Sequence, residues 1–362
     1  MSGVWGKNIT ISIFGESHGK AIGVTVSGLP PGIELDEESI KVEMRRRAPG
    51  KDELSTPRQE KDEFEIISGY FSGKTTGTPL CALIWNKDTK SKDYSLLKNV
   101  MRPSHADYTG NIRYVGSNDY RGGGHFSGRI TAPLVFAGAV AKQILKKKDI
   151  IIGSHIKSIG NIEDDYFDNV NINTVLLDEL FNVSIPVINK EKAEKMKDCI
   201  LKVKEDNDSV GGIVEAVVLN IPEGIGSPFF DSVESTLAHL LFSIPAVKGV
   251  EFGAGFNISY MKGSEANDEM YINDNKIKTY TNNNGGIVGG ITSGMPIIFR
   301  VAFKPTPSIG KTQRTVDIEK RENTVLKVCG RHDPCIVQRA IPVVEAAAAL
   351  AVLDLFLERM QI

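Results

Sequence analysis

Polar and apolar residues alternate along two stretches close to the N-terminus. Residues 8 to 14 and 23 to 28 place an apolar side chain at every second position, which is the period of a half-buried β-strand. Asp36 then precedes a segment in which Ile40 and Met44 share one helical face, so we expect a helix with Asp36 as its N-cap. The N-terminal part of the chain is therefore predicted to combine strands with a helix.

Three stretches further downstream predict helices of different burial. Residues 132 to 141 are almost entirely apolar, which is typical of a helix buried on all sides. Asn189 can cap a helix that places Met196 and Ile200 on one apolar stripe, as expected of a helix with an exposed face. An alanine-rich apolar stretch from about 335 to 358 predicts a long C-terminal helix.

Two segments far apart in the chain resemble each other. Residues 73 to 89 match residues 290 to 306 without a gap at seven positions, which pair Gly73 with Gly290, Thr75 with Thr292, Gly77 with Gly294, Pro79 with Pro296, Leu80 with Ile297, Lys87 with Lys304, and Thr89 with Thr306. The pattern Leu29-Pro-Pro-Gly-Ile33 likewise recurs as Ile221-Pro-Glu-Gly-Ile225. Chance similarity among turn residues is the alternative, but we expect an internal duplication with pseudo-repeats at about 8–90 and 210–306. Such a repeat predicts a single domain over residues 1–362, in which two similar sheets pack with their helices.

Composition and charge change this picture little. With 43 Lys and Arg against 45 Asp and Glu, the net charge of −2 gives no global basic surface that would indicate nucleic acid as a partner. The four cysteines form no CxxC pair, which fits reduced thiols in a cytoplasmic protein. No charged n-region precedes an apolar core at the N-terminus, and Glu345 and Asp354 interrupt the longest apolar run. We therefore expect neither a signal peptide nor a membrane span.

Candidate chemistry centres on three consecutive glycines, Gly122 to Gly124. Glycine adopts backbone conformations that other residues avoid and lets N–H groups approach a ligand closely. His125, Ser127 and Arg129 follow, and the predicted apolar helix starts directly after them. A glycine turn at a helix N-terminus can bind an anion. A loop that needs glycine only for its shape is the alternative.

Three consecutive arginines, Arg45 to Arg47, end the first predicted helix. Cations at a helix C-terminus interact favourably with the helix dipole, which is the simplest explanation. Adjacent helical residues point in different directions, however, so the dipole accounts for one arginine more readily than for three. Because arginine donates paired hydrogen bonds to phosphate or carboxylate, we expect an anionic ligand here. The polar stretch from 51 to 62 then predicts a mobile loop.

Further segments place chemically capable side chains in turns. They supply Ser17 and His18 at a strand end; Arg102, His105 and Asp107 around Pro103; and Arg331, His332 and Asp333 before the final helix. A second glycine cluster at 285 to 290, together with residues 304 to 308, could jointly bind phosphate or flavin. Each segment also has an ordinary explanation as a solvated turn, a polar loop or a helix cap. We interpret His155 and His239 as structural.

Four of these motifs in combination closely resemble the chorismate synthase family. They are Gly15-Glu-Ser-His-Gly19, Arg102-Pro-Ser-His-Ala-Asp107, Tyr120-Arg-Gly-Gly-Gly124 and Gly330-Arg-His-Asp-Pro-Cys335. The resemblance implies an α+β fold, a β-α-β sandwich in which two antiparallel sheets enclose helices, and a homotetramer. It also implies conversion of 5-enolpyruvylshikimate 3-phosphate to chorismate and phosphate, a 1,4-anti elimination that requires reduced FMN without net redox change.

The resemblance implies roles for individual residues as well. The substrate carries a phosphate and two carboxylates, and the residues that match its binding site are Arg46, Arg47, Arg129 and Arg331. His18, with Ser17 beside it, would protonate the leaving phosphate. His105 would donate a proton to the reduced flavin, and Asp333 would assist removal of the C6 proton of the substrate. No metal site is implied.

The predicted FMN contacts include the places where this chain departs from the family pattern. The matching residues are His125, Phe126, Ser127, Pro245, Ala246, Gly289, Lys304, Pro305, Thr306, Pro307, Ser308 and Arg331, with Ser127 also counted among the catalytic group. Many members have Arg-Ser where this chain has His125 and Phe126, and asparagine where it has Pro245. Many also carry an arginine near the acidic Asp52 and Glu53, a contact that Lys51 or Arg58 would have to replace.

Two alternatives to a monofunctional enzyme stay open. Some family members also reduce flavin with NADPH, but this chain shows no added reductase module. We therefore expect an external flavin reductase, with NADPH acting only as an indirect reductant. A non-catalytic protein that binds flavin or a phosphorylated ligand would also use the arginines and glycines. His18, His105 and Asp333 argue for catalysis, because binding alone needs no such acid–base set.

Overall fold

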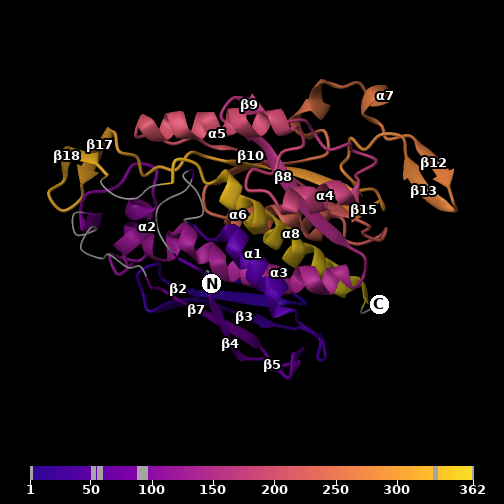
Figure 1. The fold of residues 1–362 in the computed structure, drawn as a ribbon, viewed down its shortest axis with the longest axis horizontal. Helices are drawn as coiled ribbons and strands as arrows, with labels where there is room; N and C mark the ends of the chain where they lie inside the picture. Colours follow the sequence, from indigo (N-terminus) through magenta and orange to yellow (C-terminus); the bar gives the residue numbers. More distant parts are fainter. Residues whose placement is uncertain (1–2, 50–53, 55–59, 88–96, 329–332, 361–362) are drawn as a thin grey trace.

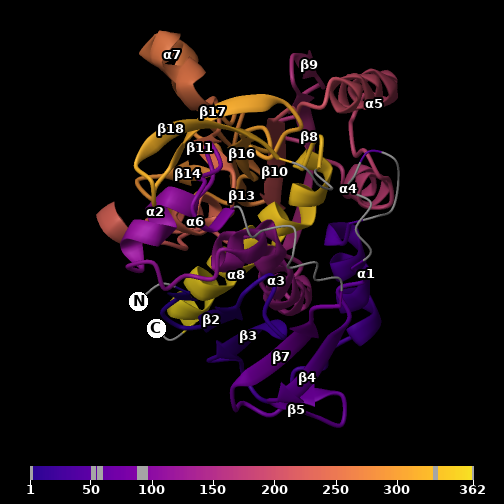
Figure 2. The same cartoon turned by 90° about the vertical axis from the view of Figure 1, so that its left-hand side faces the viewer.

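Two antiparallel sheets lie on either side of a layer of helices (Figures 1 and 2). The computed structural model describes all residues except 1–2, 50–53, 55–59, 88–96, 329–332 and 361–362. This arrangement confirms the predicted α+β sandwich.

The first sheet contains both of the strands that alternation predicted. Its strands run in the order β1 (Val4–Trp5), β2 (Thr10–Gly15), β3 (Ala21–Ser27), β7 (Leu80–Trp85) and β4 (Phe64–Ser68). One face of the sheet buries Ile22, Val24 and Ile84 against the helices, each at most 1% exposed. The period of two therefore identified the buried face as well as the strands.

The second sheet has its own five strands. They run in the order β11 (Val247–Phe252), β16 (Ile297–Phe303), β10 (Gly212–Leu219), β8 (Ile151–Ile159) and β9 (Ile162–Glu163). Its outer face carries His155, whose Nδ1 lies 3.0 Å from Asp164 Oδ2 and whose Nε2 lies 2.9 Å from Glu215 Oε2. Burial opposes the charged form, but these two hydrogen bonds raise the pKa of His155. Both ring nitrogens are thus held by carboxylates, as the structural interpretation expects.

The two sheets share one topology. β2-β3-β7-β4 in the first corresponds to β8-β10-β16-β11 in the second, with every pair antiparallel and one helix inserted at the same point of each. The two matched threonines also make the same bonds. Thr75 Oγ1 accepts from Ile33 N and donates to Pro30 O. Thr292 Oγ1 accepts from Ile225 N and donates to Pro222 O. Equal contacts at equal positions support the predicted duplication.

In the part of the chain that the structure describes, four helices lie between the sheets. They are α1 (Glu37–Arg47), α3 (Thr131–Lys146), α6 (Val233–Ser243) and α8 (Val337–Met360). The predicted cap is present, since Asp36 Oδ1 accepts from Glu38 N at 3.0 Å. A methyl group at Gly138 of α3 would lie 2.2 Å from Ala346 Cβ of α8, so only glycine permits this close contact. α8 is apolar and long enough to cross a membrane, but 89% of an apolar 18-residue stretch of this helix is buried inside the protein, as expected of a core helix.

The remaining elements surround this frame. They are α2 (Asp107–Arg113), α4 (Thr174–Phe181), α5 (Lys190–Glu205), α7 (Gly263–Ala266) and the two-stranded pairs β5 (Tyr70–Phe71) with β6 (Lys74–Thr75), β12 (Met270–Asn273) with β13 (Lys276–Thr279), β14 (Ile287–Val288) with β15 (Ile291–Thr292), and β17 (Thr312–Asp317) with β18 (Glu322–Lys327). α4 and α5 pack against β8, and the hairpin of β12 and β13 projects at one end of the molecule (Figure 1). Asn189 caps α5 as predicted, accepting from Glu191 N at 3.1 Å.

A buried carboxylate joins the helix layer to the second sheet. Glu345 of α8 accepts from Arg46 Nη1 at 2.6 Å, from Lys142 Nζ at 2.5 Å and from Ser154 Oγ at 2.7 Å. Glu43 lies on the same two cations, at 2.8 Å from Arg46 and 2.6 Å from Lys142. Burial opposes the charge on Glu345, yet these cations lower its pKa to about 2. The network therefore holds α1, α3, α8 and β8 together through one fully ionised group.

We expect Glu345→Gln to lower the free energy of unfolding at neutral pH by about 3 kcal/mol, because it removes one of the two carboxylates that compensate the buried charges of Arg46 and Lys142 and leaves Glu43 to compensate both. The folded-state pKa of about 2 lies below the ordinary value of 4.5, so the stabilisation is complete above pH 4.5 and is lost as pH falls toward 2. Urea unfolding of both proteins across this range should show their difference shrinking. A difference that stays constant with pH would contradict this assignment.

Candidate active site

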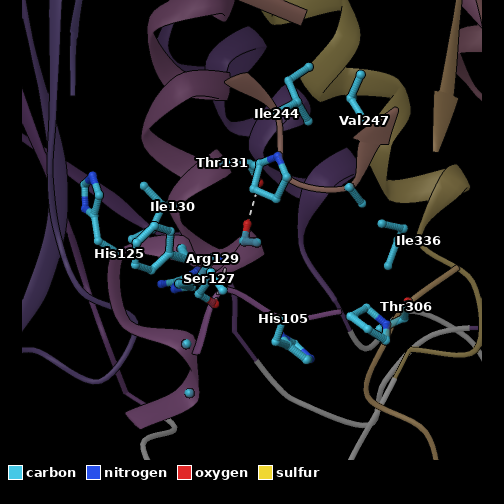
Figure 3. A pocket seen from close by; sticks show the side chains of 18 of the residues that line it. His105, His125, Ser127, Arg129, Ile130, Thr131, Ile244, Val247, Thr306 and Ile336 are labelled. Atoms are coloured by element: carbon cyan, nitrogen blue, oxygen red, sulfur yellow. Dashed lines mark hydrogen bonds between the residues drawn. The ribbon is translucent and has the colours of Figure 1, made fainter. Parts of the chain in front are cut away.

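A cavity of about 1090 Å³ lies where the ends of several elements meet. Segments from distant parts of the chain line it: the N-terminal strands, the end of α1, residues 102–107, 118–131, 239–248, 303–308, 326–328 and 333–343. Figure 3 shows His105, Ser127, Arg129 and Thr306 around this space, with Ile244, Val247 and Ile336 on its apolar side. Sequence motifs that were predicted separately therefore share one cavity.

The glycine turn forms one wall. Gly122, Gly123 and Gly124 have φ values of 59°, 88° and 53°, a region that favours glycine. Gly124 O accepts from Ser17 N at 3.2 Å, and a methyl group on Gly122 would lie 2.1 Å from His18 Cε1. Ser17 Oγ and His18 Nδ1 are 3.1 Å apart. Ser17 and His18 are thus buried directly behind the turn, whereas Gly122 and Gly123 face the cavity.

His105 joins two of the predicted motifs. Its Nε2 lies 2.7 Å from Ser308 Oγ, and the adjacent Ser104 O accepts from Lys304 Nζ at 2.6 Å. Asp107 anchors the loop that carries His105, because it accepts two hydrogen bonds from the Arg102 guanidinium at 2.8 and 2.7 Å. The ring of His105 is therefore held in a fixed position at the cavity wall.

Two of the predicted arginines line the cavity. Arg47 donates from Nε to Asp62 Oδ2 at 2.6 Å, and Arg129 donates from Nη1 to Asp62 Oδ1. Arg129 Nε also donates to Asn86 Oδ1 at 3.1 Å, while Glu60 Oε2 lies 3.4 Å from Arg129 Nη2. Burial lowers the pKa of Arg47 to about 10, against the attraction of Asp62. The arginines form a dense, partly compensated positive site.

The structure corrects the expected position of Arg46. Its guanidinium points away from the cavity, donates to Glu345 at 2.6 and 3.1 Å, and stacks 4.2 Å from the centre of the Phe181 ring. Successive residues of a helix point about 100° apart, so Arg47 can face the cavity while Arg46 points elsewhere. Arg46 therefore belongs to the buried network, and it is not among the described residues that line the cavity.

Asp333 lies at the approach to α8 and lines the cavity. Its Oδ2 accepts from Arg339 Nη1 at 2.7 Å, and Arg339 Nε donates to Arg47 O at 3.1 Å. The start of α8 is thereby tied to the end of α1. Arg331 falls outside the described residues, as do Lys51, Asp52, Glu53 and Arg58.

The predicted flavin contacts lie mainly at the cavity, and two of their side chains also contact neighbouring elements. His125, Phe126, Ser127, Pro245, Ala246, Lys304, Thr306, Pro307 and Ser308 all line it. The His125 ring bonds the carbonyl of Gly15 through Nδ1 at 2.8 Å. Phe126 packs on Tyr114 with 6.1 Å between ring centres. These two departures from the family pattern are accommodated by packing on neighbouring elements.

Gly289 and Pro305 were predicted as flavin contacts, but of the described residues that line the cavity neither is one. Gly289 lies in the turn between β14 and β15, where glycine satisfies a φ of 62°. Pro305 stands between two residues that do line the cavity, Lys304 and Thr306.

Other lining residues were not identified from the sequence. Glu60 belongs to the stretch that polarity predicted as a mobile loop, and His239 was interpreted as structural although it lines the cavity. Asp62, from the same stretch as Glu60, is 2% exposed. The only sequence signal for Glu60 and Asp62 was their i, i+2 spacing just before a strand, which is too common to indicate a site.

The glycine turn yields a matched pair of substitutions. Gly122→Ala should lower the free energy of unfolding by about 2–3 kcal/mol, because a positive φ is strained for alanine and the methyl group displaces the His18 ring. Gly123→Ala carries the same kind of strain, but its methyl group would meet nothing closer than 3.8 Å. Urea unfolding should therefore give a lower free energy of unfolding for Gly122→Ala than for Gly123→Ala. Equal losses would show that His18 does not pack on the turn as described.

Comparisons with known proteins agree with this geometry. The family model described as chorismate synthase matches residues 9–357. Chorismate synthase from Thermococcus gammatolerans is 48% identical over 355 residues, covering 98% of this chain and 97% of the relative. The enzyme from Methanocaldococcus jannaschii is 48% identical over 364 residues, covering 98% and 96%. A solved structure, "Crystal Structure of Chorismate Synthase", aligns with a TM-score of 0.78 and 32% identity, covering 98% of this chain and 93% of that one. The chain belongs to the chorismate synthase family, whose members form chorismate in the shikimate pathway.

Proposed function

We propose that the cavity binds reduced FMN together with 5-enolpyruvylshikimate 3-phosphate, and that the protein eliminates phosphate from this substrate to give chorismate. The observation that carries the proposal is that His105, Asp333 and two arginines face one cavity with an apolar wall. Binding groups and proton-transfer groups lie together there, as an elimination of phosphate requires.

The residues present fit a flavin. Leu134, Ile244, Val247 and Ile336 give an apolar surface for a ring system. Thr306 Oγ1 is buried and makes no hydrogen bond to any residue that the structure describes, so it has a bond to offer a ligand. When bound, reduced FMN would supply electron density that eases departure of phosphate without net redox change.

The cofactor phosphate would be bound by lysine. Burial and the neighbouring Lys248 lower the pKa of Lys304. A bound anion would relieve that repulsion. Backbone groups at residues 125–127 and 245–246 and the hydroxyls of Thr306 and Ser308 would hold the rest of the cofactor.

The substrate anions would be bound by Arg47 and Arg129, together with Arg331 from outside the described residues. Arginine suits these groups because its fork donates two parallel hydrogen bonds to a phosphate or carboxylate. A chain with a net charge of −2 must concentrate such residues at one place to bind a substrate with three anionic groups. The cavity does so.

Three side chains would hold or move protons. His105, oriented by Ser308, would donate a proton within the cavity. Asp333, oriented by Arg339, would assist removal of the substrate C6 proton. His18 would stabilise the leaving phosphate from behind the glycine turn, with Ser17 beside it. Ser127, four residues before α3, would orient Arg129, because Ser127 Oγ already accepts a hydrogen bond from Arg129 N at 3.3 Å.

Several broader features belong to the same proposal. The protein would work in the cytoplasm as a homotetramer and would receive reduced FMN from an external flavin reductase, so that NADPH serves only as an indirect reductant. Exposed apolar side chains such as Phe256, Tyr260 and Ile272 support assembly with further copies. A non-catalytic flavin- or phosphate-binding protein is the second candidate, and it is disfavoured by the fixed orientation of His105 and Asp333 in the cavity.

Anaerobic assay of the purified protein with 5-enolpyruvylshikimate 3-phosphate tests the proposal. We expect equimolar phosphate and chorismate with reduced FMN, and neither product without it. Oxidised FMN with NADPH should not be bleached unless a separate reductase is added. Flavin binding without product would favour the non-catalytic candidate, and bleaching by the protein alone would overturn the monofunctional assignment.

His105→Ala and Asp333→Ala should each reduce kcat by at least about a hundredfold, the usual scale of acid–base assistance. Binding of FMN, followed by fluorescence quenching, should persist in both variants because neither change removes the apolar wall. Near-normal turnover in both variants would contradict the proton-transfer roles. Loss of FMN binding would instead assign His105 or Asp333 to cofactor binding.

A further inference from the structure

Two acidic residues, Glu60 and Asp62, lie among the arginines to which the proposed function assigns substrate binding, and the inference below rests on that function. An anion site that already contains carboxylates needs an explanation, because their charge opposes the binding of a negatively charged substrate. The two residues differ in burial, in contacts and in access to the cavity.

Asp62 is enclosed and bridges both arginines. Its side chain is 0% exposed, and it is not one of the described residues that line the cavity. Oδ2 binds Arg47 Nε at 2.6 Å and Nη2 at 2.5 Å, while Oδ1 binds Arg129 Nη1. Its φ of 53° is sparsely populated for a residue other than glycine and persists only when surrounding contacts enforce it. A ligand in the cavity therefore cannot easily displace this carboxylate.

Glu60 faces the cavity and contacts a different edge of Arg129. With Nε bonded to Asn86 and Nη1 to Asp62, only Nη2 of this guanidinium makes no hydrogen bond to a described residue. Glu60 Oε2 lies 3.4 Å from Nη2, close enough for charge attraction but not for a good hydrogen bond. Nη2 is therefore the donor that Arg129 presents to an incoming anion, at the place where Glu60 now lies.

We propose that the two acidic residues have opposite roles in anion binding: Asp62 is a positioning residue that fixes the guanidinium groups of Arg47 and Arg129, and Glu60 is a carboxylate that an anionic group of the substrate replaces at Arg129 Nη2. Asp62 improves binding because two forks held in one orientation lose less freedom when the substrate binds. Glu60 weakens binding because it must first be displaced.

A simple charge effect predicts something different. Asp62→Asn and Glu60→Gln each remove one negative charge beside the same arginine, so general electrostatics would tighten anion binding in both. The proposed roles instead give opposite signs. An asparagine side chain in place of Asp62 would turn an amide N–H₂ toward one of the guanidinium groups and leave that fork without an acceptor.

The test is the dissociation constant of 5-enolpyruvylshikimate 3-phosphate, measured by calorimetry with FMN-loaded enzyme and compared with KM and kcat. We expect Asp62→Asn to raise the dissociation constant at least about tenfold and Glu60→Gln to lower it about threefold, the scale of single charged contacts. Affinity for FMN should change less than about twofold in both, because neither residue lies on the apolar wall.

Two control variants separate this role from folding. Glu43→Gln removes a carboxylate from Arg46 of the same helix, outside the cavity, and should lower Tm without changing substrate affinity. Asp62→Glu keeps the charge but moves the carboxylate by one methylene, and it should weaken substrate binding even if Asp62→Asn does not fold. Inorganic phosphate is titrated in parallel as a probe of the arginines that does not depend on the identity of the substrate.

Tighter binding in Asp62→Asn, unchanged binding in Asp62→Glu, or weaker binding in Glu60→Gln would overturn the proposal. Inorganic phosphate distinguishes this proposal from the proposed function. If Asp62→Asn weakens phosphate binding and Glu60→Gln tightens it, but the wild type does not turn over the substrate, the proposed function fails and the roles of Glu60 and Asp62 stand.

Discussion

The carboxylate of Glu345 is the interaction on which the helix layer depends. It lies in the middle of α8 at 2% exposure and is ionised there because Arg46, Lys142 and Ser154 supply its hydrogen bonds. An isolated charge in such a place would cost several kcal/mol, so the three partners must stay in position together. Since they come from α1, α3 and β8, one group sets the relative positions of the central helices and the second sheet.

The position of Arg46 in this network also affects the cavity, because the next residue of α1 is Arg47, which lines the cavity. Arg46 is held by the buried network, and the helix then directs Arg47 about 100° away, toward the cavity and Asp62. Arg339 reinforces the same geometry, because it bonds both Arg47 O and Asp333. These contacts fix the backbone at the end of α1, and the fixed backbone determines the direction in which the Arg47 side chain enters the cavity.

Much of the fold could be predicted from the sequence because it depends on local periodicity: alternation indicated β2 and β3, and helical spacing after a capping residue indicated α1. The candidate site was less predictable because it depends on direction. Composition could not decide which of two neighbouring arginines faces the cavity: both were expected at the substrate, but only Arg47 is among the described residues that line the cavity, whereas Arg46 bonds Glu345. The polarity of the stretch from 51 to 62 predicted a mobile loop. Asp62 is instead buried by contacts with Arg47 and Arg129 that only the tertiary structure creates.

The proposed chemistry requires one cavity to bind cofactor and substrate side by side, with Arg47, and not Arg46, at the substrate. A crystal structure of the protein with FMN and 5-enolpyruvylshikimate 3-phosphate tests this requirement most directly. We predict flavin density against Ile244, Val247 and Thr306, and substrate density at Arg47 and Arg129 Nη2 with Glu60 displaced. Substrate density at Arg46, or flavin density outside the cavity, would contradict it.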